Sequence, residues 1–215
     1  TGRRIAGNAA NNLVPCQMEL GGKSPHVVFA DVDIEKAVNG VVSGIFAAAG
    51  QSCVAGSRCF VEAPIYDRFV EALVARTQQI TVGHPMEEHT DIGPLALQAQ
   101  LQKLEGYIAS GARQGAQIAV GGKRPNAANL SEGWYFEPTV MANATNDMPF
   151  MRDELFGPVV GVMPFSTEEQ MLSLANDTHY GLASGIWTQN IDRALRFANG
   201  IDAGTVWINT YRSSA

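Results

Sequence analysis

The sequence predicts an α/β domain with an open, largely parallel, twisted sheet flanked by helices. Short apolar runs bounded by turn residues alternate with longer segments of helical periodicity, which is the pattern of parallel strands joined by crossover helices. The 215 residues, 46% hydrophobic and 17% charged, suffice for one large core. No internal repeat or low-complexity linker interrupts this pattern.

The first quarter of the chain contains both helical and strand-like segments. Its opening helix is weak, because glycine and asparagine have low helix propensity. The turn-forming sequence GGKSP separates two apolar runs. The expected elements are a helix after Gly2, strands over 16–20 and 26–29, and a helix from residue 34 to near Gly50 that Asp31 or Asp33 caps.

The rest of the chain alternates between the two patterns. Strands are expected over 57–62, 117–120, 134–140, 159–165, 184–187 and 205–208. Helices are expected over 66–80, 95–110, 168–175 and 191–199. The segment 121–133, rich in Gly, Asn, Pro and Ser, reads as a solvent loop.

Charge and composition exclude several classes of partner. The formal net charge is −6 and the 15 Lys and Arg are scattered, so we expect neither nucleic-acid nor anionic-membrane binding. No apolar run approaches the roughly 20 residues that span a bilayer. Three cysteines do not make a disulfide framework, and a reducing, cytoplasmic location is expected.

The sequence GQSC places Cys53 at a sharp turn after an apolar helix. A turn among small residues exposes a thiol to substrate, as a nucleophile requires. The alternative is a buried apolar filler, which is the usual role of a free cysteine. We expect that structural role for Cys16 and Cys59.

Two carboxylates accompany this cysteine as candidate site residues. Glu19 closes the first expected strand, where loops at carboxyl ends commonly form ligand crevices, and it could act as a general base. Glu154 begins a turn into another strand and could face a ribose hydroxyl pair, with Phe156 as a flat apolar wall. Taken singly, each glutamate also fits a solvated surface position.

Together, the motifs resemble those of the NAD(P)-dependent aldehyde dehydrogenase superfamily. The ordered set is MELGGKSP, GQSC, ELFGPVV and GTVWIN, with supporting matches in TDIGPL, EGYI, GWYFEPTV and YGLASGIWT. The resemblance extends from about Gly2 to Tyr211. It implies an aldehyde substrate and NAD or NADP as the cofactor, with NAD favoured.

The resemblance assigns a role to each motif. Cys53 matches the nucleophile that forms a thiohemiacetal and then a thioester, and Glu19 matches the base that activates water for hydrolysis. Glu154 matches the nicotinamide-ribose ligand and Phe156 the ring that lines the nicotinamide. Other positions matched to cofactor contacts are Leu20, Gly21, Gln100, Lys103 and Gly2, and those expected to bind substrate are Ser52, Val54, Tyr211 and Arg212.

Members of the superfamily are more than twice as long as this chain. We therefore expect residues 1–21 to be a remnant of the cofactor-binding domain, 22–215 to be the catalytic domain, and the full-length protein to form a homo-oligomer. An asparagine that serves the family as a second oxyanion donor belongs upstream of Thr1. No metal site is expected, because HPMEEH offers too few converging ligands.

Two other functions stay open on the sequence. A cysteine and glutamate pair without a cofactor could hydrolyse activated esters. The same fold could also serve as a non-catalytic structural domain, in which Cys53 would be inert.

Overall fold

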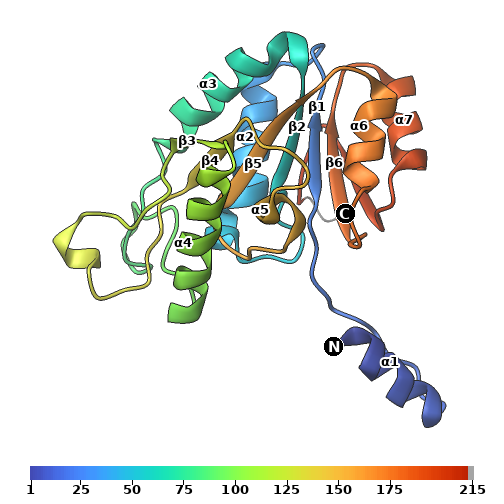
Figure 1. Ribbon diagram of the computed structural model, residues 1–215, viewed down its shortest axis with the longest axis horizontal. Helices are drawn as coiled ribbons and strands as arrows, with labels where there is room; N and C mark the ends of the chain where they lie inside the picture. Colours follow the sequence, from blue (N-terminus) through green and yellow to red (C-terminus); the bar gives the residue numbers. More distant parts are fainter. Residues whose placement is uncertain (213–215) are drawn as a thin grey trace.

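The computed structural model describes residues 1–212, which are built around one mixed sheet (Figure 1). Within these residues seven strands pair in the order β3-β4-β5-β2-β1-β6-β7, and all neighbours are parallel except β3 and β4. The expected largely parallel sheet is confirmed. The strands are β1 (Pro25–Val28), β2 (Arg58–Glu62), β3 (Gln117–Val120), β4 (Thr139–Ala142), β5 (Val159–Phe165), β6 (Ala183–Trp187) and β7 (Thr205–Ile208).

Helices cover both faces of the sheet, except α1, which lies apart from it (Figure 1). Helices α2 and α3 share one apolar core with the sheet, and helices α4 to α7 share a second. The helices are α1 (Gly2–Asn11), α2 (Ile34–Phe46), α3 (Tyr66–Thr77), α4 (Gln98–Arg113), α5 (Pro149–Arg152), α6 (Glu168–Asn176) and α7 (Ile191–Gly200), with short 3₁₀ turns η1 (Ala47–Gly50), η2 (Ala63–Ile65) and η3 (Ala128–Leu130).

Alternate residues of the central strands point into the two cores. Val28 and Val61 pack under α2 and α3, whereas Val27 and Phe60 pack on the other face. A strand buried on both faces needs apolar residues at every position. This explains why the strands read in the sequence as continuous apolar runs.

Several predicted elements differ from the structure. Residues 16–20 form no strand, because they belong to an exposed segment that pairs with no other strand. The strand expected over 134–140 begins only at Thr139, and α4 begins at Gln98 because Leu97 is still extended. The short helix α5 carried no periodic signal, since it spans only four residues.

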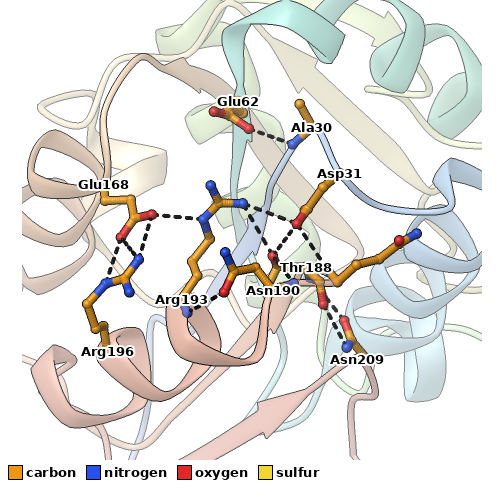
Figure 2. Close-up of polar contacts among 10 residues, drawn as sticks. Ala30, Asp31, Glu62, Glu168, Thr188, Asn190, Arg193, Arg196 and Asn209 are labelled. Atoms are coloured by element: carbon orange, nitrogen blue, oxygen red, sulfur yellow. Dashed lines mark hydrogen bonds and ion pairs between the residues drawn. The ribbon is translucent and has the colours of Figure 1, made fainter.

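The carboxyl edge of the sheet is tied to α6 and α7 by polar contacts (Figure 2). The Arg193 guanidinium donates to Glu168 at 2.8 Å and to Asp31, after β1, at 3.2 Å. Its hydrogen bond to Glu168 holds the pKa of that carboxyl below the usual range. Thr188, after β6, donates to the same Asp31 oxygen at 2.8 Å. This network lies at the opposite edge from the predicted site.

Candidate active site

The predicted site residues lie in loops that enter β1, β2 and β5, at the amino edge of the sheet. Gly21 precedes β1, Cys53 precedes β2, and Glu154 precedes β5. These three strands are adjacent and parallel, so their entry loops meet. Contrary to the prediction, Glu19 does not lie at the carboxyl end of a strand, because residues 16–20 form no strand.

Cys53 follows a strained connection from α2. Ala48 and Ala49 adopt positive φ angles of 54° and 53°, a conformation that is unfavourable for residues with a Cβ, and Gly50 follows at 68°. A Cβ on Gly50 would lie 2.1 Å from the Gly157 carbonyl oxygen, so only glycine permits this approach to the loop before β5. Strain of this kind concentrates at functional sites.

The thiol of Cys53 is partly exposed, and its turn is closed by a hydrogen bond from the Ala55 N–H to the Ser52 carbonyl at 3.0 Å. The other two cysteines differ from it in setting. Cys59 is fully buried in β2, as expected, and burial raises the pKa of its thiol. The buried role expected for Cys16 is wrong, because this residue lies exposed in the segment after α1.

Gly21 and Gly22 join the turn at Ser52–Ala55, the Cys53 turn, to Glu154. The Gly22 N–H donates to Glu154 Oε1 at 3.1 Å, and a Cβ on Gly22 would lie 2.6 Å from the Cys53 carbonyl oxygen. A Cβ on Gly21 would lie 2.1 Å from Glu154 Oε2. Gly22 is therefore required by its approach to a backbone carbonyl, whereas a side chain at residue 21 would have to displace the Glu154 carboxylate.

Helix α4 holds the segment that carries Glu154 and Phe156. Lys103 Nζ donates to the Glu154 carbonyl at 2.6 Å, and the Gln100 side-chain amide donates to the carbonyls of Leu155 and Phe156. Phe156 has a positive φ of 56° and a ring that is 41% exposed. In this structure Gln100 and Lys103 fix the backbone from which the Glu154 and Phe156 side chains project.

Glu19, Leu20 and Gly2 lie on the exposed N-terminal side of the site. Glu19 accepts a hydrogen bond from Gln17 at 3.3 Å, its one side-chain partner within residues 1–212. Leu20 is 47% exposed, and a Cβ on Gly2 would lie 2.7 Å from its Cδ1 atom, so the start of α1 returns to Leu20. Glu19 is thus accessible but makes no recorded contact with Cys53.

The residues expected to bind substrate differ in their solvent exposure. Ser52 and Val54 flank the thiol and are partly exposed. Tyr211 is buried, and its hydroxyl donates to the Val54 carbonyl at 2.8 Å. Arg212 has a positive φ of 60° and is partly exposed.

Sequence reasoning did not assign several residues that shape the site. Gln51 accepts a hydrogen bond from the Ala96 N–H at 2.9 Å and so ties the Cys53 turn to the loop before α4. Lys23 is buried next to Gly22; burial lowers its pKa to about 7, and the neighbouring charge of Arg58 acts in the same direction. The motifs GQSC and GGKSP contain Gln51 and Lys23, but pattern alone does not reveal a long-range partner.

Neither a metal-binding cluster nor a membrane-spanning helix is found in the described residues 1–212. No group of three or more His, Cys, Asp or Glu side chains is arranged there to hold a metal ion. No helix in that part of the chain is both long and apolar enough to cross a bilayer.

Comparison with known proteins gives consistent matches. The model of the "Aldehyde dehydrogenase family" matches residues 1–215. A betaine aldehyde dehydrogenase of Brucella anthropi is 46% identical over 211 residues, which cover 98% of this chain and 43% of that protein. A betaine aldehyde dehydrogenase of Mesorhizobium japonicum is 44% identical over the same shares.

Solved structures match equally well. A crystal structure of betaine aldehyde dehydrogenase from Staphylococcus aureus in complex with NAD+ has a TM-score of 0.94 at 43% identity, covering 99% of this chain and 42% of that one. An aldehyde dehydrogenase from Bacillus cereus has a TM-score of 0.92 at 41% identity, covering 99% and 43%. The chain thus spans less than half the length of these relatives. By its family match and these relatives, it belongs to the aldehyde dehydrogenase family.

Proposed function

We propose that this chain is the catalytic part of an NAD-dependent aldehyde dehydrogenase that oxidises an aldehyde to a carboxylic acid, with Cys53 as the nucleophile. The observation that carries the proposal is the position of Gly22 between two site residues. Its N–H donates to Glu154, and its Cα lies close to the Cys53 carbonyl. A thiol and a carboxylate from distant parts of the chain thereby share one site. Family membership supports the reaction class.

The first step assigned to Cys53 is attack of its thiolate on the aldehyde carbon, which forms a thiohemiacetal. The negative oxygen of that adduct needs a preorganised donor. Within residues 1–212 the Cys53 N–H makes no backbone hydrogen bond, so it is available for this oxygen. The asparagine expected as a second donor belongs to the longer protein.

The residues around Glu154 fit the nicotinamide end of the cofactor. Gly22 holds one Glu154 oxygen, and carboxylate oxygens accept hydrogen bonds from ribose hydroxyls. The exposed side chains of Leu20 and Phe156 provide apolar surface on the two neighbouring segments. NAD bound there would supply the hydride acceptor that converts the thiohemiacetal to a thioester. NAD is favoured over NADP because the Staphylococcus aureus relative is described with NAD+.

Glu19 is proposed as the base for the second half of the reaction. Its carboxylate is exposed and carried by a segment without regular structure. A carboxylate able to reach the thioester could take a proton from water, and the resulting hydroxide would release the acid and restore the thiol. We also propose that residues 1–21 pack with the cofactor-binding part of the longer protein, and that this protein is a homo-oligomer.

The test is an assay of the longer protein with NAD and betaine aldehyde, the substrate that the names of the relatives suggest. Cys53→Ala should abolish NADH formation, including the first turnover. Glu19→Gln should keep the first turnover but slow the steady state by roughly 100-fold, as expected for loss of a general base. Cys59→Ala, which changes a thiol in the core, serves as the matched control. Activity that survives in Cys53→Ala would overturn the proposal.

A further inference from the structure

The Cys53 turn packs next to a buried pair of aromatic rings, those of His26 and Tyr211. His26 lies on β1 and is fully buried, and its ring centroid is 3.9 Å from that of Tyr211 with the planes tilted by 32°. The ring of Trp207 also packs on Tyr211, with the two centroids 4.5 Å apart. The phenol ring therefore has two aromatic neighbours.

Three glycines make the space that this pair occupies. A Cβ on Gly56 would lie 1.9 Å from His26 Cδ2, and one on Gly44 would lie 2.5 Å from His26 Nε2. On β6, a Cβ on Gly185 would lie 2.6 Å from Tyr211 Cδ2. These glycines come from α2, from the entry to β2 and from β6, so the fit of the two rings depends on three separate elements.

The imidazole is a neutral ring in this setting. Burial lowers the pKa of His26 to about 3, so it carries no charge near neutral pH. Neither ring nitrogen has a hydrogen-bond partner within residues 1–212. An unpartnered donor and acceptor destabilise a core. What the ring does provide is a compact flat face for the phenol.

The Tyr211 hydroxyl links this pair to the Cys53 turn by a hydrogen bond. It donates to the Val54 carbonyl at 2.8 Å, and Val54 follows Cys53 in the chain. Gly22 lies against the Cys53 carbonyl. The two peptide bonds that flank Val54 are thus each contacted by a distant part of the chain.

We propose that Tyr211, supported from behind by His26, is a positioning residue that fixes the Cys53 turn for nucleophilic attack. It acts through the Val54 carbonyl and sets the direction of both the Cys53 sulfur and the Cys53 N–H. The inference rests on the proposed role of Cys53. It also gives Tyr211, first expected to bind substrate, a role in the architecture of the nucleophile.

The test compares Tyr211→Phe with Tyr66→Phe in the full chain. Tyr66 is a matched control, because its hydroxyl also donates to a main-chain carbonyl, that of Val162, at 3.2 Å. Iodoacetamide labelling across a pH series, read by peptide mass spectrometry, gives the ratio of Cys53 to Cys16 labelling, with exposed Cys16 as the internal reference. Hydrogen exchange over residues 52–56 is measured in parallel.

We expect Tyr211→Phe to lower the Cys53 to Cys16 ratio by at least about fivefold, to change its pH profile and to speed exchange in the turn. Tyr66→Phe should leave all three within about twofold of the unmodified chain. If the two variants give the same labelling ratio, pH profile and exchange rates while Cys53 of the unmodified chain is labelled fast, only the positioning role of Tyr211 is overturned. Slow Cys53 labelling in the unmodified chain overturns the proposed function as well. If Tyr211→Phe does not fold, His26→Asn, which keeps the hydroxyl and removes the ring behind it, is judged by the same criteria.

Discussion

The Gly22 N–H donates to Glu154 Oε1 at 3.1 Å across a separation of 132 residues. The two residues belong to the entry loops of β1 and β5, and β2 lies between these strands in the sheet. The contact therefore bridges the entry to β2, where Cys53 is located. It explains how loops that are distant in the chain converge on one thiol.

Gly21→Ala should break this contact. The new methyl group would lie 2.1 Å from Glu154 Oε2, so the carboxylate must move away and the Gly22 N–H must lose its acceptor. We expect a loss of about 1–3 kcal/mol in the free energy of unfolding, measured by urea titration. If Glu154 binds the nicotinamide ribose as proposed, calorimetry on this chain joined to a cofactor-binding domain should show NAD affinity reduced about tenfold or more, because the carboxylate is displaced.

Gly106→Ala is the control for this substitution. Gly106 lies in α4, and a Cβ there would meet nothing within 4 Å. Alanine should stabilise the helix by about 0.5–1 kcal/mol without changing NAD binding. Unchanged NAD affinity in Gly21→Ala would show that Glu154 tolerates displacement.

Gln100→Leu should loosen the segment that carries Glu154 and Phe156. The amide donates to two successive carbonyls, of Leu155 and Phe156, and the second residue is held at a positive φ. Leucine keeps the bulk but removes both donors, at a cost of about 1–3 kcal/mol. Hydrogen exchange over 154–157 should accelerate. The exposed neighbour Gln102, changed to leucine, should leave that exchange unaltered.

The central strands β1, β2, β5 and β6 were predictable from sequence because they are almost fully buried and read as continuous apolar runs. Strands 117–120, 159–165 and 205–208 have the bounds that the apolar runs indicated. The strand predicted over 16–20 is absent, since an apolar run between turn residues does not reveal whether a partner strand exists. Pairing is a long-range property that a local pattern does not contain.

The sequence named candidate site residues but not their geometry. The motif resemblance proposed Cys53, Glu19 and Glu154, and the structure brings Cys53 and Glu154 to one edge of the sheet. The supports behind them were missed for a physical reason. His26 and Lys23 act through burial and through neighbours from other elements, and burial of a polar side chain is not apparent in a local sequence.

His26 should make the fold sensitive to acid. Its pKa is 6.5 in an unfolded chain and about 3 when buried, so the unfolded state binds the extra proton between these values. The stabilisation is complete above pH 6.5 and decreases as the pH falls towards 3, by up to about 1.4 kcal/mol per pH unit. His26→Asn should remove this pH dependence from the free energy of unfolding, measured by urea titration between pH 3 and 6.5. His179→Asn, at an exposed position, should keep the slope of the unmodified chain, and an equal slope in all three proteins would contradict the prediction.

Lys23 should make stability rise in alkaline solution. Its side chain is 1% exposed, and within residues 1–212 its Nζ atom has no hydrogen-bond partner. Burial, followed by the charge of Arg58, lowers its pKa from 10.5 to about 7, so the unfolded state binds more protons between these values. The free energy of unfolding should therefore increase with pH through this window, by up to about 1.4 kcal/mol per unit.

Lys23→Met keeps the length of the side chain and removes the charge, so it should be more stable than the unmodified chain at neutral pH by about 1 kcal/mol or more. The difference should shrink as the pH approaches 10, where the buried amine is already neutral in the folded state. Lys36→Met, at a position whose side chain is 82% exposed, should show no such pH-dependent gap. A Lys23→Met protein that is less stable than the unmodified chain at every pH would instead mean that attraction to Asp153 and Glu154 outweighs the cost of burial. In that case the lysine would count as part of the electrostatic support of Glu154, and NAD affinity of the longer protein should fall with the same substitution.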